Sequence, residues 1–284
     1  MEKLKNTKIG LVMSRANHKI ACLGPEGTFS YLVAARIFPG QQYLLCKTIG
    51  QVFATVKNKK ANYGIVPIEN AIGGIIQETI DQFYINKVRV VGSYRAPIRH
   101  CLLARTTNRK KIKIIRSHNQ ALNQCKEWLA KNFPDAVLVS ENSSVQAMLS
   151  NFKKDTAFVS SKEAARKYGL KVLAEDIQDY KNNFTEFYVI AKVPRHQPSK
   201  KLKASNSIMI ITVKDRPGVL RDILNAFADR ELNLAKLHSR FNIFKGRDYY
   251  FFLEVESLPE NKNFKSALKE MHKYCTDIKL LGVV

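Results

Sequence analysis

Residues 19–37 read KIACLGPEGTFSYLVAARI and contain a strand, a turn and a helix in direct succession. The run Lys19–Leu23 is short and mainly apolar, as a buried strand is, and it ends at the first glycine of GPEGT. Beyond the turn, apolar side chains at positions 29, 32, 33 and 37 recur at helical spacing. A strand that runs straight into a helix is the unit from which α/β folds with largely parallel sheets are built.

The same alternation continues through the first two thirds of the chain. We expect further strands at 63–68, 88–91, 98–104, 112–115, 136–139, 157–160, 172–177 and 187–191. The apolar spacing predicts helices at 49–56, 76–83, 120–131, 145–150 and 162–168. In α/β sheets of this kind, ligands bind beyond the carboxyl ends of the strands, beside helix N-termini.

The pattern changes after a stretch with the composition of a linker. Residues 194–205 contain two prolines and a lysine cluster but few apolar side chains. Strands are then expected at 208–213, 234–241, 249–255 and 278–283, and helices at 217–227 and 264–271, in the βαββαβ order of a ferredoxin-like unit. We therefore expect an N-terminal extension (1–18), a first domain (19–193), the linker, and a second domain (206–284).

The composition is that of a soluble globular protein. Hydrophobic residues make up 45% and charged residues 25% of the 284 residues. No apolar run approaches the roughly 18 residues of a membrane helix, and the start MEKLKNTKIG lacks the apolar core of a secretory signal. The five cysteines are widely spaced and form no CxxC pair. These features predict a cytoplasmic protein without a disulfide framework, a zinc site or a membrane contact.

The charge is strongly positive and unevenly distributed. The chain carries a formal net charge of +23, and residues 1–204 hold 34 basic and 14 acidic side chains, an excess of 20. Such a charge favours nucleic acid or small polyanions as partners, although a solvated lysine-rich surface is the simpler interpretation. The basic cluster at 109–116 lacks the interleaved aromatic side chains of a single-strand binding face, which makes nucleic acid an unfavoured partner.

Four polar segments each follow or precede an expected strand. They are GPEGTFS (24–30), VPIENAIGG (66–74), SHNQ (117–120) and NNFTEF (182–187). Taken singly, each is typical of turn or capping chemistry, such as a helix cap by Thr28. Glu69 and Asn70 place an acid and an amide at a strand end, and Gln120 and Gln124 share one helix face. Their common position at strand ends indicates a binding site.

Together these segments resemble the prephenate dehydratase family. GPEGTFS, VPIEN with its GG, SHxQALxQC and NNxTxF occur in the family's order. DRPGVL (215–220) and LHSR (237–240) are similar to the PGAL and ESRP segments of the ACT regulatory domain that is usually fused to the enzyme. The resemblance implies an α/β catalytic domain of two lobes, like those of periplasmic binding proteins, with the active site in the cleft, followed by a ferredoxin-like ACT domain.

The resemblance also implies a reaction and its residues. Prephenate would lose CO2 and its hydroxyl to give phenylpyruvate, in L-phenylalanine biosynthesis, without a cofactor or metal. Thr185 would protonate or hydrogen-bond the departing oxygen, with His118 in a supporting place. The substrate-contacting positions would be Thr28, Glu69, Asn70, Ser117, Gln120, Gln124 and Phe187. L-Phenylalanine would bind as effector at Gly218, Val219, Leu220, His238, Ser239 and Arg240, at the seam of paired ACT domains in a homodimer or homotetramer.

Three departures from the family pattern bear on activity and regulation. Glu186 stands where the family usually has arginine, Ala71 where it has serine or threonine, and His238 where the effector segment has glutamate. If 183–191 is extended, Thr185 and Phe187 face the cleft and Glu186 faces away. Two alternatives remain open at this point: a catalytically impaired protein that senses an aromatic metabolite, and an arogenate dehydratase.

Overall fold

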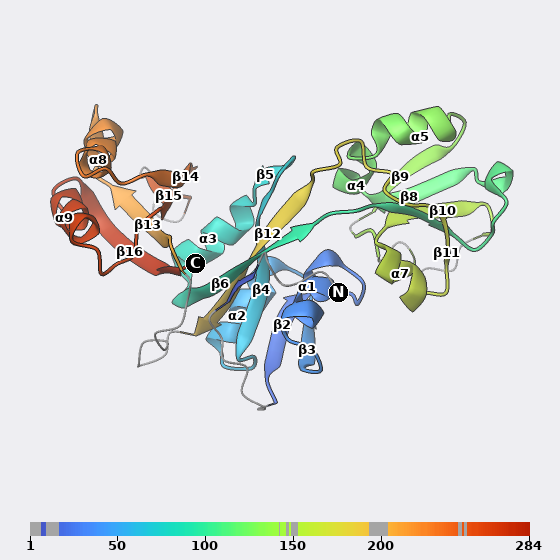
Figure 1. The fold of residues 1–284 in the computed structure, drawn as a ribbon, viewed down its shortest axis with the longest axis horizontal. Coiled ribbons are helices and arrows are strands. Elements are labelled where there is room, and N and C mark those ends of the chain that lie inside the picture. Colours follow the sequence, from blue (N-terminus) through green and yellow to red (C-terminus); the bar gives the residue numbers. More distant parts are fainter. Residues whose placement is uncertain are drawn as a thin grey trace.

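The computed structural model describes residues 7–9, 17–141, 143–145, 148, 153–192, 204–243, 246 and 249–284. They form three parts that lie in a row (Figure 1). Lobe one is in the middle, lobe two lies beside it, and the C-terminal domain packs on its other side. None of the helices described is long and apolar enough to cross a membrane.

Lobe one is a mixed sheet with three helices. Its strands are β1 (Thr7–Ile9), β2 (Lys19–Leu23), β3 (Gln42–Cys46), β4 (Tyr63–Asn70), β5 (Gly74–Ile75), β6 (Val88–Pro97) and β12 (Phe184–Lys192). The helices are α1 (Phe29–Ile37), α2 (Ile49–Lys57) and α3 (Gln77–Ile85). Strands β3, β2 and β4 are parallel, whereas β12 lies antiparallel between β4 and β6. The apolar side chains of α2 and α3 pack in the main core.

Lobe two is inserted between β6 and β12, so two chain segments connect the lobes. Its strands are β7 (Cys101–Ala104), β8 (Ile114–His118), β9 (Val137–Glu141), β10 (Thr156–Ser160) and β11 (Lys171–Ala174), in the order β11-β7-β10-β8-β9. A 3-10 turn (Arg109–Lys111) and helices α4 (Asn119–Asn123), α5 (Lys126–Asn132) and α7 (Lys162–Lys167) complete it. The carboxyl ends of β8 and β10 therefore face lobe one with the helix starts that follow them.

The C-terminal domain has the expected βαββαβ order. It contains β13 (Ser207–Val213), α8 (Val219–Ala228), β14 (Leu234–Phe241), β15 (Tyr249–Val255), α9 (Lys262–Met271) and β16 (Cys275–Val283). Its sheet order is β14-β15-β13-β16. Strand alternation sends Met209 and Ile211 into the core under the helices, and Ile208 and Ile210 into the core shared with lobe one. The central strand β13 is therefore buried on both faces of the sheet.

A single parallel pairing joins the C-terminal sheet to lobe one. Gly282 of β16 lies opposite Val90 of β6, and the two sheets form one 11-stranded sheet through it. A Cβ on Gly282 would stand 2.0 Å from the Val90 carbonyl oxygen, so only glycine permits this approach.

The predicted fold class is confirmed, with some differences in detail. The sheets are mixed rather than largely parallel, because β6 and β12 cross between the lobes in opposite directions. Strand β3 was not expected, since QYLLC lies at the sheet edge and shows no regular alternation. The helix predicted at 120–131 is two short helices, part of the predicted N-terminal extension is strand β1, and the helix predicted at 145–150 lies largely outside the described residues.

Candidate active site

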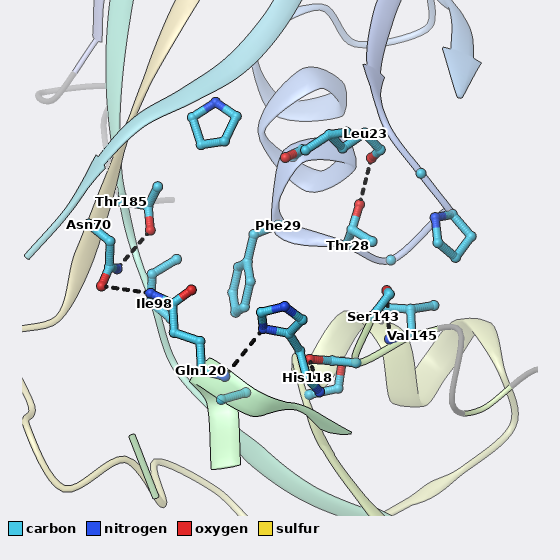
Figure 2. Close-up of a pocket in the computed structure, with 18 of the residues that line it drawn as sticks. Leu23, Thr28, Phe29, Asn70, Ile98, His118, Gln120, Ser143, Val145 and Thr185 are labelled. Atoms are coloured by element: carbon cyan, nitrogen blue, oxygen red, sulfur yellow. Dashed lines mark hydrogen bonds between the residues drawn. The ribbon is translucent and has the colours of Figure 1, made fainter. Parts of the chain in front are cut away.

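A cavity of about 890 Å³ lies between the two lobes. Lobe one and the connecting segments contribute Thr28, Phe29, Lys47, Pro67, Asn70, Ile98, His100, Thr185 and Phe187. Lobe two contributes His118, Gln120, Gln124, Ser143, Ser144, Val145 and Ser160. Figure 2 shows side chains of both lobes converging on this space. A cleft between two α/β lobes is what the family resemblance implied.

Asn70, the last residue of β4, holds the hydroxyl of Thr185 by a direct hydrogen bond. The two residues lie opposite each other in the β4–β12 pairing, and Asn70 Nδ2 donates to Thr185 Oγ1 at 3.0 Å (Figure 2). The same amide nitrogen lies 3.0 Å from Asn183 Oδ1 and from the Phe184 carbonyl oxygen. Because Thr185 Oγ1 accepts from Asn70, its own proton is available to donate. The side chain is 8% exposed.

The side-chain oxygen of Asn70, Oδ1, forms contacts with both lobes. Asn70 Oδ1 accepts from the Gly73 backbone nitrogen at 2.9 Å and lies 3.3 Å from the Nε2 atoms of both Gln120 and Gln124. A Cβ on Gly73 would stand 2.6 Å from Gln120 Nε2, so any larger residue on this turn would displace the Gln120 amide from its present position. The two glutamines share a helix face as predicted, and both line the cavity.

His100 is a lining residue that sequence reasoning missed. It is 3% exposed, and its Nε2 lies 2.9 Å from Gln124 Oε1. Since Gln124 donates through Nε2 to Asn70, its Oε1 is the acceptor, and His100 Nε2 carries the proton. Burial lowers the pKa of His100, although the hydrogen bond that His100 donates to Gln124 acts in the opposite sense. Nδ1 has no partner among the residues described. In the sequence, His100 is a single histidine before an apolar run, and no motif around it indicates a binding site.

The side chains of Thr28 and His118 cap the N-termini of α1 and α4. Thr28 Oγ1 accepts from the Tyr31 backbone nitrogen at 3.3 Å and donates to the Leu23 carbonyl at 2.8 Å. His118 Nδ1 accepts from the Gln120 backbone nitrogen at 3.3 Å. Both side chains also line the cavity, so the start of α1 contributes its positive dipole end to the site.

Two predicted substrate contacts lie outside the cavity lining. Ser117 is fully buried, with Oγ 2.6 Å from the Val159 carbonyl oxygen and 2.8 Å from Ser144 Oγ, so it supports a lining residue. Glu69 points to the opposite side of β4 from Asn70, and its carboxylate lies 3.2 Å from Lys236 Nζ. The family resemblance implied Ser117 as a substrate contact, and Glu69 was predicted together with Asn70 as an acid and an amide at one strand end.

Glu186 also faces away from the cavity, whereas Thr185 and Phe187 line it. Its carboxylate lies 2.5 Å from Lys236 Nζ and 4.0 Å from Arg95 Nη2. The orientation expected from strand alternation is therefore confirmed. Among the described lining residues there is no carboxylate, and Lys47 is the single lysine or arginine.

The residues expected to bind an effector are divided between two faces of the C-terminal domain. Gly218 adopts φ +80° at the start of α8, and Val219 is buried in the core behind it. In β14, Ser239 lies on the exposed face. His238 and Arg240 lie on the other face, where Arg240 Nε donates to Asp81 Oδ1 of lobe one at 2.9 Å. Within one chain, Arg240 therefore holds the interface to lobe one.

Comparison with known proteins covers both parts of the chain. A family model described as prephenate dehydratase matches residues 20–195, and one described as ACT domain matches residues 207–273. A bifunctional chorismate mutase/prephenate dehydratase from Aquifex aeolicus is 36% identical over 93% of this chain and 72% of that protein. A prephenate dehydratase from Methanocaldococcus jannaschii is 33% identical over 91% and 94%.

A solved structure agrees with these matches over nearly the same length. The prephenate dehydratase from Arthrobacter aurescens, in complex with L-Phe, superposes with a TM-score of 0.84 at 28% identity, over 93% of this chain and 89% of that chain. Sequence, fold and the two-lobed cavity agree, and the chain belongs to the prephenate dehydratase family.

Proposed function

We propose that this protein is a lyase that converts prephenate to phenylpyruvate, CO2 and water, as a step of L-phenylalanine biosynthesis. The observation that carries the proposal is the Thr185 hydroxyl, which Asn70 holds at 3.0 Å in the cavity between the lobes. The family membership supports the substrate, and the cavity supplies a place for it.

The reaction makes modest chemical demands on the protein. The bond between the ring and its carboxylate breaks, CO2 departs, and the electron pair enters the ring. The carbon–oxygen bond on the opposite side breaks, and the hydroxyl takes up a proton and leaves as water. The ring becomes aromatic, which provides a large driving force. The protein must therefore orient the substrate and assist the departing oxygen.

Thr185 is suited to the second task. Its proton can form a hydrogen bond to the departing hydroxyl, because its oxygen already accepts from Asn70 Nδ2. Threonine is a weak acid in water, but the side chain is 8% exposed, and a donor to its oxygen polarises the hydroxyl. Thr185 donates its proton to the departing oxygen, which leaves as water, and the threonine oxygen takes up a proton from solvent before the next turnover.

The cavity is also suited to a dianion. Neutral amide donors from Gln120, the start of α1 and the ammonium of Lys47 line it. The carboxylates of Glu69 and Glu186 point to Lys236 instead. The excess of 20 positive charges in residues 1–204 would raise the local concentration of an anionic substrate. The alternative of an impaired metabolite sensor rested on Glu186 and Ala71. Glu186 contacts Lys236 instead of the cavity, and Ala71 is not a lining residue, so this alternative is not favoured.

We infer that L-phenylalanine regulates this activity through the C-terminal domain. The ACT match and the L-Phe complex of the Arthrobacter aurescens relative support an amino-acid effector. Gly218 to Leu220 and Ser239 would form one half of its site, and a second copy of the chain paired along β14 would complete it. The exposed side chains of Leu237 and Phe241 on this edge strand support a homodimer.

The test is an assay of phenylpyruvate formed from prephenate, with and without L-phenylalanine and with arogenate as a competing substrate. We expect turnover without added metal or cofactor and inhibition by L-phenylalanine. Turnover no greater than the buffer blank from folded protein would refute the proposed reaction. Preference for arogenate would move the assignment to arogenate dehydratase.

A further inference from the structure

A buried ion cluster lies behind the candidate active site. Lys236 of β14 places its ammonium 2.5 Å from Glu186, 3.2 Å from Glu69 and 3.0 Å from Glu254. The three carboxylates come from three different strands, β12, β4 and β15. The side chains of Lys236, Glu186 and Glu254 are 14%, 9% and 7% exposed, and that of Glu69 is 33% exposed. One cation of the C-terminal domain therefore contacts two acids of lobe one.

The cluster depends on this one lysine. Burial by itself lowers the pKa of Lys236. The contacts with Glu186 and Glu254 raise the pKa by more than burial lowers it, to about 12, so the side chain stays charged. Arg95 is the other cation near Glu186, at 4.0 Å, and its side chain is 55% exposed. Without Lys236, carboxylates that now share one ammonium would repel one another in a place that water reaches poorly.

The two lobe-one acids are chain neighbours of the residues that form the catalytic hydrogen bond. Glu186 follows Thr185 in β12, and Glu69 precedes Asn70 in β4. In the β4–β12 pairing, Thr185 lies opposite Asn70, and Glu186 lies opposite Glu69. Because strand side chains alternate, one pair meets in the cavity and the other meets Lys236 behind it.

The backbone at this point is only partly restrained by the sheet. The register shifts directly after Glu186, so that Phe187 pairs with Pro67 and Ile68 is left over as a bulge. Proline has no N–H to donate, and a bulge interrupts the regular ladder. On its other side β12 stays paired with β6, and the Ala71 backbone nitrogen donates to the Phe184 carbonyl oxygen at 2.9 Å. At the interruption of the β4–β12 ladder, the contacts of Glu186 and Glu69 with Lys236 are an additional restraint on the separation of these two strands.

We propose that Lys236 is a positioning residue for the reaction: by holding Glu186 and Glu69 together from behind, it sets the separation of Thr185 and Asn70 in the cavity. The C-terminal domain thereby determines the geometry of a site to which it contributes no lining residue among those described. The proposal rests on the proposed function for the role of Thr185. The acid at 186 makes this ion pair a feature of this chain, since the family resemblance implies arginine there.

The first test compares Lys236→Met with Lys236→Arg and with Lys279→Met. Lys279 is the matched control, because it is also a C-terminal-domain lysine that contacts lobe one, donating to the carbonyls of Phe83 and Asn86 at 2.6 and 2.7 Å. We expect Lys236→Met to lower kcat for prephenate at least tenfold with KM changed less than threefold. Lys236→Arg should stay within threefold of wild type, and Lys279→Met within twofold. Wild-type kcat in Lys236→Met, or an equal loss in Lys279→Met, would overturn the proposal.

A second measurement needs no activity. We expect amide hydrogen exchange of 184–187 and 69–71 to accelerate at least tenfold in Lys236→Met, but not in Lys236→Arg or Lys279→Met. If the wild type turns over neither prephenate nor arogenate, the proposed function fails, and this measurement still decides the inference: unchanged exchange overturns it.

If Lys236→Met does not fold, the reversed pair Glu186→Lys with Lys236→Glu replaces it. The kcat of this double variant should be at least tenfold higher than the kcat of Lys236→Glu alone. An equally low kcat in both variants would count against the proposal.

Discussion

Thr185, Glu186 and Phe187 show how three consecutive residues serve two sides of one strand. Thr185 and Phe187 line the cavity, and Glu186 contacts Lys236 behind it. The departure from the family at position 186 therefore changes the interface with the C-terminal domain and leaves the lining of the cavity unchanged. A charge change beside Thr185 leaves the cavity lining intact because the strand directs adjacent side chains to opposite faces.

Replacing Thr185 by alanine tests the proposed donor. We expect kcat to fall about 100-fold, the scale of a general-acid contribution, because no other described side chain is placed to donate through the same hydrogen bond. KM should change less than threefold. Thr79→Ala is the control, since Thr79 is fully buried and donates to the Pro67 carbonyl at 2.6 Å outside the cavity lining. Steady-state kinetics decide, and full kcat in Thr185→Ala would remove the assignment.

His100 predicts a pH dependence of stability. Its folded-state pKa is lowered from the ordinary value of 6.5, mainly by burial. As the pH falls below 6.5, the unfolded chain takes up the proton and the folded chain resists it, so the free energy of unfolding falls, by up to about 1.4 kcal/mol per pH unit between the two pKa values. Urea unfolding at pH 8 and pH 5.5 should show a smaller loss in His100→Gln than in wild type. Equal losses would contradict this account.

At the scale of elements, α3 is the helix that links the cavity to the C-terminal domain. It begins directly after Ile76, which lines the cavity. Asp81 in its middle accepts from Arg240, and Lys279 caps its end by donating to the carbonyls of Phe83 and Asn86. A cation at a helix C-terminus is favourable because the last carbonyls have no partner within the helix.

Removing this cap should lower stability. We expect Lys279→Met to reduce the free energy of unfolding by about 2 kcal/mol, the scale of charge-assisted hydrogen bonds in a partly buried place. Lys214→Met is the matched control, because Lys214 donates to one carbonyl at an exposed position, and it should cost less than about 0.5 kcal/mol. Chemical denaturation measures both. Equal costs would show that the helix end does not depend on Lys279.

At the scale of the whole molecule, the 11-stranded sheet ends at β14 with its edge open in the single chain. Phe241 and Tyr249 are 47% and 45% exposed there, with ring centroids 5.6 Å apart. Exposed apolar side chains along a sheet edge favour pairing with another strand. We expect this edge to meet the same edge of a second copy.

The variant Phe241→Glu tests that pairing. A carboxylate in place of an apolar ring would lose its hydration in the seam, so we expect the dimer measured by light scattering to dissociate and L-phenylalanine inhibition to be lost. Val137→Glu is the control, because Val137 is 61% exposed on β9, an edge strand of lobe two, and should leave both properties unchanged. A stable dimer in Phe241→Glu would place the interface elsewhere.

Local sequence was sufficient for the fold class and for much of the site. The strand–turn–helix order, the cap by Thr28, the shared face of Gln120 and Gln124, and the outward direction of Glu186 all follow from short-range geometry. Each depends on residues within one strand or one helical turn, where the periods of 2 and 3.6 leave little choice. The mixture of parallel and antiparallel strands could not be predicted in this way, because the residues of a strand do not determine which other strand it pairs with.

Tertiary structure alone decided the contacts between distant segments. Strand alternation places Glu69 on the opposite face of β4 from Asn70, but only the packing of that face against Lys236 shows which of the two faces the cavity. The burial of Ser117 under Ser144 is likewise a tertiary contact. His100 enters the cavity only because lobe two is inserted between β6 and β12. Lys236 and Glu186 stand 50 residues apart in the chain, and nothing in either segment indicates the other. Their pairing is set by sheet order and by how the second domain docks, which are properties of the assembled core and of no single segment.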